Sequence, residues 1–380
     1  MTLAPAPEPA SGPRSRPARD AAPFRSRFES LGQKLPEKRL GTRELLDSCR
    51  HRPRVDLEKL TGIRERRVCS EGEDSYSLAV DAAWDCLSRS RYEPGDIEML
   101  ISTSITKYQN GLVFRFEPSL SFFVKEAIGA SRALHFDVAN ACAGMLTGVY
   151  ILDDFIRRGV VKRGMVVSGE YISSISDNAA RKVRTILSKQ LASLTVGDSG
   201  AALILERAEN GAPGITACEF ATYAEHSGLC IGKACDSAPG AAMYTNPRKL
   251  HQVAIDSAHP TLLAALEKTG ISIQDVDWLI PHQTSVRAIR AGTKHIGARV
   301  GGVPKHIVYN LEEFGNTAST THFLALHRYL QEGRFRPGER ILLLVFASGV
   351  VCGALIFTMD ELCEKFAARR GVGESHGRRD

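Results

Sequence analysis

Long apolar segments are scarce in this sequence of 380 residues. The first residues lack the apolar stretch of about 7–15 residues that a secretory signal requires. One uncharged run, from Ile341 to Phe357, approaches the length of a membrane span. Small residues and two glycines interrupt its middle, which favours two buried strands joined by a turn. We therefore expect a cytoplasmic protein with no membrane span.

Paired cysteines are also missing. The nine cysteines form no C-x-x-C pair, and their odd number argues against a full disulfide framework. They are typical of reduced thiols in a cytosolic protein, where most serve as small core residues. We predict neither a metal site nor a cofactor.

The body of the chain lacks a surplus of positive charge. The formal net charge is +6, but residues 1–27 hold five Arg against two acidic residues, and residues 366–380 hold four Arg against two. These ends account for +3 and +2, which leaves the remaining body at about +1. A nucleic-acid-binding domain needs a basic body, so we expect no nucleic-acid partner.

The composition of the ends predicts where order begins and stops. Residues 1–27 contain six of the 17 prolines, mixed with Ala, Ser and Arg, which is typical of a disordered leader. The Gly- and Arg-rich residues 369–380 predict a disordered tail. The folded part then divides into an N-terminal half at residues 28–207 and a C-terminal half at residues 214–362, joined by a linker at residues 208–213.

Hydrophobic periodicity between the ends alternates between two patterns. Short apolar runs predict buried strands at residues 99–102, 165–168, 201–205, 278–280 and 341–346. Segments with a 3.6-residue period predict helices at residues 77–88, 145–158, 260–268, 286–295 and 321–331. Strands that alternate with helices indicate an α/β fold with mostly parallel sheets.

The sequence also contains an internal repeat. Residues 96–103, DIEMLIST, parallel residues 275–282, DVDWLIPH. Near the end of each half, residues 200–205, GAALIL, parallel residues 352–357, CGALIF. We therefore predict two similar α/β halves.

Cys142 lies where a short strand gives way to an amphipathic helix that ends near Gly159. The helix dipole and the free N–H groups at such an elbow stabilise a thiolate. Small flanking residues let an acyl group approach the sulfur. Taken alone, the same segment is more typical of a buried structural cysteine than of a nucleophile.

Two further segments place polar residues after predicted strands. His282 follows Leu279-Ile280-Pro281, and Asn316 lies in a Gly-Asn turn before a helix. Each alone is typical of a structural histidine or a capping turn. Together with Cys142 they lie at strand C-termini, where the active sites of open α/β sheets collect. Such a trio can take an acyl group onto sulfur and stabilise a thioester enolate.

Five motifs resemble those of the β-ketoacyl-acyl-carrier-protein synthase III group of the thiolase superfamily. In the family's order, over about residues 28–360, they are Thr61–Arg67 (TGIRERR), Asp137–Gly144 (DVANACAG), Gly197–Ala202 (GDSGAA), Pro281–Gln283 (PHQ) and Gly315–Thr317 (GNT). The resemblance implies a five-layered αβαβα fold made of two similar halves, and a homodimer.

The resemblance also implies roles for individual residues. Cys142 matches the acylated nucleophile, while His282 and Asn316 match the pair that hydrogen-bonds the carbonyl of the second thioester. The family's oxyanion hole uses the nucleophile's own N–H and a second N–H, which here would lie near Ser348. Ala347 and Ser348 stand where the family usually has glycines, so their side chains narrow this turn.

A loop at residues 114–119, FRFEPS, bears on the second substrate. In the resembling fatty-acid enzymes this loop reaches into the partner subunit's acyl pocket, and an apolar residue stands where this chain has Glu117. A carboxylate against an apolar channel should have a raised pKa, which suits a general base. The olefin-biosynthesis thiolases, which join two fatty acyl thioesters without decarboxylation, are similar at this position.

Other interpretations stay open. Glu117 could instead point to solvent or pair with Arg115. Decarboxylative condensation with a malonyl thioester, or the joining of acyl units into a resorcinol or pyrone, would use the same His282 and Asn316. Inactive thiolase-fold subunits of heterodimers typically lack the nucleophile or its partners. All three are present here, so we expect an enzyme.

Delivery of the thioesters involves a basic stripe. Arg287, Arg290 and Lys294 recur on one predicted helix face. Such a stripe suits an acidic acyl-carrier-protein helix or the phosphates of coenzyme A, and it is as typical of an ordinary solvated face. Residues 55–60 lack the Trp and Arg that hold the adenine of coenzyme A in the resembling enzymes. This difference favours carrier-protein delivery of at least one substrate.

Overall fold

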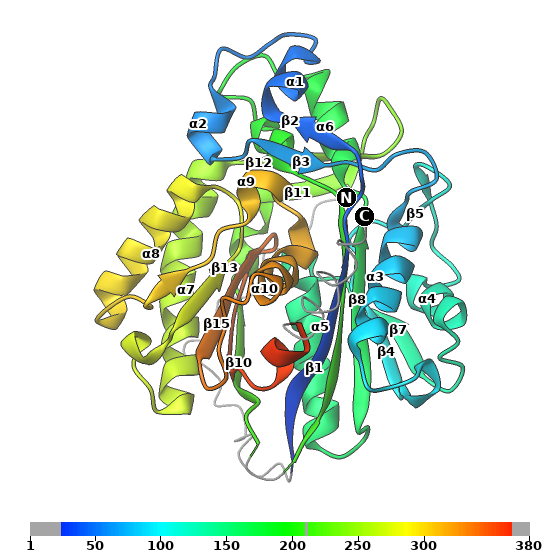
Figure 1. Ribbon diagram of the computed structural model, residues 1–380. Coiled ribbons are helices and arrows are strands. Elements are labelled where there is room, and N and C mark those ends of the chain that lie inside the picture. The colour runs from blue at the N-terminus through cyan, green and yellow to red at the C-terminus, as the bar shows by residue number, and fades with distance from the viewer. Residues whose placement is uncertain (1–23, 210–211, 367–380) are drawn as a thin grey trace, which may run out of the picture.

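The computed structural model describes residues 24–209 and 212–366 (Figure 1). The predicted leader up to residue 23 and the predicted tail lie outside the described residues. The first strand, β1 (Arg25–Lys34), begins three residues before the predicted start of order. The boundary at residue 27 is therefore too late. The Arg27 guanidinium is buried against the Glu206 carboxylate at 2.7 Å, and composition alone does not reveal such a pairing.

The N-terminal half is built on a five-stranded sheet with the order β1-β9-β8-β4-β7. Its further strands are β4 (Met99–Ser102), β7 (Leu134–Asp137), β8 (Arg163–Glu170) and β9 (Ser199–Ala208). Strand β4 pairs in parallel with β7 and β8, and β9 pairs antiparallel with β1 and β8.

The C-terminal half is built on a second five-stranded sheet with the order β10-β16-β15-β13-β14. Its strands are β10 (Ile215–Thr222), β13 (Trp278–Pro281), β14 (His306–Ile307), β15 (Arg340–Ala347) and β16 (Val351–Thr358). Strand β13 pairs in parallel on both sides, as β4 does in the first sheet, and β16 pairs antiparallel on both sides.

The two sheets correspond strand by strand, which confirms the two similar halves. The repeated sequences lie on β4 and β13, and on β9 and β16, which hold equal places in the two orders. The expectation of mostly parallel sheets is wrong, because both sheets are mixed. In the second half, β16 follows β15 through a tight turn, and an antiparallel return of this kind needs no crossover helix.

Six larger helices complete five layers, as predicted (Figure 1). They are α3 (Ser75–Arg89), α4 (Leu120–Ile128), α5 (Gly144–Arg157), α7 (Pro247–Thr269), α8 (Val286–Val300) and α10 (Thr321–Gln331). Helices α5 and α10 pack between the sheets, α3 and α4 cover the first sheet, and α7 and α8 cover the second.

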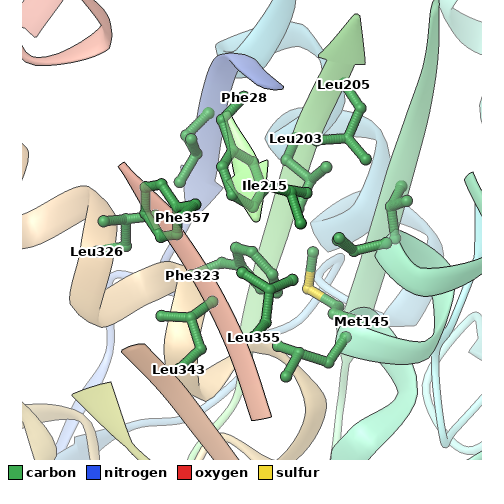
Figure 2. Packing of buried hydrophobic residues seen from close by; sticks show 14 of the residues in the cluster. Phe28, Met145, Leu203, Leu205, Ile215, Phe323, Leu326, Leu343, Leu355 and Phe357 are labelled. Atoms are coloured by element: carbon green, nitrogen blue, oxygen red, sulfur yellow. The ribbon is translucent and has the colours of Figure 1, made fainter. Parts of the chain in front are cut away.

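The central layer has the largest apolar core (Figure 2). Met145 of α5 and Phe323 of α10 pack among residues of both sheets, including Phe28, Leu355 and Phe357. The rings of Phe28 and Phe357 meet edge to face, with centroids 4.8 Å apart. Truncating such a buried aromatic residue costs about 3–5 kcal/mol. This packing fixes the N-terminal ends of α5 and α10, where the candidate site lies.

Helix α7 is longer than the predicted helix at residues 260–268. It starts at Pro247, and the Asn246 side chain caps it by accepting the N–H of Lys249 at 3.2 Å. Proline is common in the first helical turn, and Pro247 rather than Pro260 occupies that position. Pro260 lies inside the helix.

Short elements cover the ends of the sheets. They are β2 (Arg39–Gly41), α1 (Thr42–Asp47), α2 (Leu57–Thr61), β3 (Glu65–Arg67), β5 (Tyr108–Gln109), β6 (Val113–Phe114), α6 (Ser173–Ala180), β11 (Cys230–Ala234), β12 (Ala241–Thr245) and α9 (Leu311–Phe314). The uncharged run at residues 341–357 forms β15 and β16, as predicted. Among the described residues, no helix has the length and apolar character needed to cross a membrane.

Candidate active site

Cys142 lies at the predicted elbow between a strand and a helix. Strand β7 leads into a 3-10 turn, η3 (Ala141–Ala143), and α5 begins directly after it. Ala141 adopts the left-handed conformation, with φ of 43°, which reverses the chain ahead of the sulfur. Gly144 lets α5 start close to its neighbours, because a Cβ there would lie 2.8 Å from the Thr103 carbonyl oxygen. The segment thus presents Cys142 at the start of a helix.

The thiol of Cys142 is not acidic in this setting. Burial raises its pKa to about 12, and the nearby Cys230 and Glu170 add to the effect. The helix dipole favours a thiolate, but the loss of solvation outweighs it. The resting enzyme therefore holds a protonated thiol.

His282 follows the last residue of β13. Its backbone N–H donates to the Leu344 carbonyl oxygen at 3.0 Å, which ties the residue to the neighbouring strand β15. Burial lowers the pKa of the imidazole to about 3, with a smaller contribution from His322. The ring is therefore neutral at physiological pH. Its Nδ1 is buried without a hydrogen-bond partner among the described residues.

Sequence reasoning missed His322, which lies in the first turn of α10. Its ring stacks on that of His282, with centroids 5.8 Å apart and planes at 24°. Its Nε2 lies 3.1 Å from the Leu344 carbonyl oxygen, which also accepts the N–H of His282. Burial lowers the pKa of His322 to about 4. The only available signal was a histidine among apolar residues in the predicted helix.

Asn316 is held through its backbone by the segment at residues 195–197. Its N–H donates to the Thr195 carbonyl oxygen at 2.9 Å, and its own carbonyl accepts the N–H of Gly197 at 3.0 Å. Its side-chain oxygen accepts the N–H of Ala318 at 3.0 Å, which leaves the NH2 group as the free donor. A Cβ on Gly197 would lie 2.3 Å from the Phe314 carbonyl oxygen, so this close approach requires glycine.

The structure brings the segments of Cys142, His282 and Asn316 together. The η3 turn contacts β15 and a second 3-10 turn, η7 (Ala318–Thr320), which follows Asn316. Cys142 packs against the cluster that contains Val196 and Ala318, on either side of the Asn316 backbone. His282 is joined to the same region through β15 and through His322, three residues beyond Ser319.

Glu170 is a second residue that sequence reasoning missed. It ends β8, is fully buried, and accepts the Ser168 hydroxyl at 3.0 Å, the Ser319 hydroxyl and the Ile105 N–H at 3.1 Å. Burial raises its pKa to about 7, although these hydrogen bonds oppose the shift. The carboxyl group thus joins β8, the loop after β4 and the η7 turn next to Asn316.

The predicted oxyanion turn lies against the nucleophile segment. Residues 348–350 join β15 to β16, and both strands contact η3. Ser348 is half-buried, and Gly349 has a φ of 122°, in the region that favours glycine. This places Ser348 beside the Cys142 segment.

The basic stripe lies on α8, which begins four residues after His282. Arg287, Arg290 and Lys294 are all exposed. The first turn of the helix packs on the TGIRERR motif, since a Cβ on Gly62 would lie 2.6 Å from a Val286 methyl group. The stripe therefore starts near the site and runs away from it over the surface.

Glu117 is not brought to Cys142 within the single chain. It is exposed, on a loop whose Phe116 is 79% exposed and whose Phe114 is 44% exposed. The burial predicted for Glu117 in an apolar channel is therefore absent from the chain by itself. The Arg115 guanidinium lies 5.2 Å from the centre of the Phe123 ring.

The five-layered fold is thiolase-like, and comparisons with known proteins indicate an acyltransferase of the condensing-enzyme class. Two family models match the chain: 3-oxoacyl-[acyl-carrier-protein (ACP)] synthase III over residues 136–224, and its C-terminal domain over residues 266–359. Both halves of the chain are therefore similar to the 3-oxoacyl-[acyl-carrier-protein] synthase III family.

Curated relatives agree with the family models. The chain is 28% identical over 311 residues to the β-ketoacyl-[acyl-carrier-protein] synthase III of Oceanobacillus iheyensis, covering 79% of this chain and 92% of the relative. It is 29% identical over 304 residues to that of Symbiobacterium thermophilum, covering 78% and 86%.

Solved structures share the fold. The Aquifex aeolicus 3-oxoacyl-[acyl-carrier-protein] synthase III matches with a TM-score of 0.76 and 25% identity, over 88% of this chain and 100% of that one. Xanthomonas campestris OleA with bound lauric acid and lauroyl-CoA matches with a TM-score of 0.78 and 24% identity, over 88% and 99%. The second likeness establishes the fold alone.

Proposed function

We propose that this condensing enzyme joins two acyl thioesters by Claisen condensation without decarboxylation. The convergence of the Cys142, His282 and Asn316 segments around one region supports a Claisen condensation by either route. The route without decarboxylation is supported by Glu117, an acid on an exposed loop next to exposed aromatic residues. Glu117, supplied by a second copy of the chain, would be the base.

The first half-reaction loads Cys142. The Cys142 thiol attacks the carbonyl carbon of an acyl thioester and gives up its proton as the new S–C bond forms, and the donor leaves as a free thiol that takes the proton. The N–H groups of Cys142 and Ser348 would stabilise the oxyanion of the intermediate. Because burial raises the pKa of the thiol to about 12, deprotonation must accompany the attack rather than precede it.

The second half-reaction needs hydrogen-bond donors for an enolate oxygen. His282 is neutral, and its buried Nδ1 has no acceptor among the described residues, so the ring proton belongs on Nε2. The free NH2 group of Asn316 is a second donor. Two neutral donors stabilise the negative charge that develops on the thioester oxygen.

The carbanion then has to be made without loss of CO2. A base removes the α-proton, the α-carbon attacks the acyl-cysteine carbonyl, and the Cys142 thiolate leaves. The product is a β-ketoacyl thioester. Glu117 suits the base because its loop exposes Phe114 and Phe116, apolar surface that a second subunit would cover.

The decisive experiment offers paired acyl thioesters with and without a malonyl thioester, followed by product mass. Glu117→Ala should leave acyl loading of Cys142 intact and reduce joining of two non-malonyl thioesters by at least about 100-fold. Glu126→Ala, which removes another exposed acid near the same loop, is the matched control. Product that forms only with malonyl thioester, or unchanged turnover in Glu117→Ala, would favour decarboxylative condensation instead.

Loading is tested separately. Cys142→Ala should show no acyl adduct by intact mass, while His282→Ala and Asn316→Ala should load and fail to condense. Persistent acylation of the Cys142→Ala variant would show that a residue other than Cys142 is the nucleophile.

Delivery of the acyl donor is tested on the basic stripe. Neutralising Arg287, Arg290 and Lys294 together should raise KM for a carrier-bound acyl donor more than for acyl-CoA.

A further inference from the structure

Two short segments at one end of the molecule carry a high local positive charge, although the net charge of the body is close to zero. Residues 50–54 (RHRPR) and 181–189 (RKVRTILSK) hold seven Lys and Arg and no Asp or Glu. All seven cations are exposed. We call these two segments the basic cap.

The fold holds the two segments of the basic cap side by side. The N–H of Arg50 donates to the Ala180 carbonyl oxygen at 3.0 Å. Val183 is buried in a small core with Cys49 and Leu57, which anchors both segments on α1, α2 and α6 at the top of Figure 1. The basic cap is thus one surface rather than two separate loops.

Few acidic groups neutralise this surface. Among the described residues, only Arg52 of the seven cations forms an ion pair, with Asp47. Asp177 lies close enough to Arg181 to interact electrostatically, and Asp236 lies close enough to Lys182. For the other four cations the described residues show no ion pair with an acid.

Two aliphatic residues stand in the middle of the basic cap. The N–H of Ser188 donates to the Thr185 carbonyl oxygen at 3.1 Å, which closes a turn with Ile186 and Leu187 at its tip. Ile186 is 56% exposed and Leu187 is 87% exposed. Turn tips normally carry Gly, Asn, Asp, Pro or Ser, so an Ile-Leu tip exposes apolar surface at a cost.

We propose that the basic cap docks on an anionic lipid bilayer, with Ile186 and Leu187 entering the interfacial region. Cations spaced around an apolar tip match a surface that is negatively charged outside and apolar beneath. A nucleic-acid site would need aromatic side chains for base stacking, and the tip is aliphatic. An acidic protein surface would pair with the cations, but it would not give Ile186 and Leu187 an apolar environment.

Vesicle co-sedimentation tests this proposal with the full-length protein. The protein should bind vesicles that mix phosphatidylglycerol with phosphatidylcholine, and not vesicles of phosphatidylcholine alone, and added salt should weaken the binding. Replacing Arg181, Lys182 and Arg184 by Gln should lower the partition coefficient by about 100-fold, since each cation near such a surface contributes roughly a factor of five. Ile186→Ser with Leu187→Ser should also release the protein.

The matched control removes three cations from α8 by replacing Arg287, Arg290 and Lys294 with Gln, and it should leave vesicle binding unchanged. Unchanged melting temperatures would confirm that all variants fold. Failure of the wild-type protein to bind anionic vesicles at low salt would overturn the proposal, as would equal loss in the α8 variant. Binding to an acidic carrier protein that depends on the basic cap, without vesicle binding, would reassign the surface to a protein partner.

Discussion

At the scale of single residues, the candidate site depends on burial more than on local sequence. Enclosure raises the pKa of the Cys142 thiol to about 12 and lowers that of His282 to about 3. Both groups are therefore neutral near pH 7. Chemistry between two neutral groups requires that protons move together with bond formation rather than ahead of it.

The reactivity of Cys142 should follow from this pKa. The rate of its alkylation by iodoacetamide should rise about tenfold per pH unit between about pH 7 and pH 9, because only the thiolate reacts. Peptide mass spectrometry separates Cys142 from the other cysteines, and the buried Cys352 serves as an unreactive internal reference. An alkylation rate that stops rising near neutral pH would mean that the helix dipole lowers the pKa of the thiol by more than burial raises it.

Glu170 should make stability depend on pH. Its pKa in the folded chain is about 7, above the ordinary value of 4.5, so the folded state binds the proton more tightly. That contribution is complete below about pH 4.5 and is lost as the pH rises through 7. Wild type should therefore lose about 3 kcal/mol relative to Glu170→Gln over this range. Urea unfolding of both proteins at several pH values measures the difference, and parallel curves would contradict the prediction.

At the scale of elements, close contacts between turns position the catalytic groups. The segment at residues 195–197 holds Asn316 by two backbone hydrogen bonds, and this approach leaves no room for a Cβ on Gly197. The buried carboxylate of Asp198 secures the same segment by accepting the N–H groups of Cys69, Ile172 and Ser173 at 2.7–2.8 Å.

Gly197→Ala should therefore damage condensation more than loading. The added methyl group would displace the Phe314 carbonyl and with it Asn316, at a cost of roughly 1–3 kcal/mol in stability. Gly95→Ala, where a Cβ meets nothing within 4 Å, is the control and should behave like wild type. Single-turnover kinetics separate acylation of Cys142 from product formation. Equal rates of condensation in the two variants would show that the turn tolerates the shift.

At the scale of the whole molecule, the proposed site is incomplete in one chain. Glu117 lies on an exposed loop, while Cys142 is half-buried against the central core. If the loop serves the partner subunit, Cys142→Ala and Glu117→Ala subunits should complement each other.

Mixing these two inactive proteins after dissociation should restore about one quarter of wild-type condensation, since half of the dimers are mixed and each has one intact site. Each variant alone should be inactive with non-malonyl thioesters. Activity that never recovers, in a mixture shown by mass spectrometry to contain mixed dimers, would place the base within the same chain.

The sequence by itself determined the duplicated architecture, because buried strands and amphipathic helices leave a periodic pattern in each half. It also predicted that Cys142 and His282 follow strands, since local motifs encode turns, whereas Asn316, which it also placed after a strand, in fact follows the short helix α9. Only the tertiary structure decided that both sheets are mixed, because strand direction depends on how the chain returns between neighbours. Only the tertiary structure revealed Glu170 and His322, because their protonation depends on enclosure by distant segments. It also revealed the basic cap, whose two parts lie about 130 residues apart in sequence. Burial and long-range contact are properties of the folded chain, and no local pattern records them.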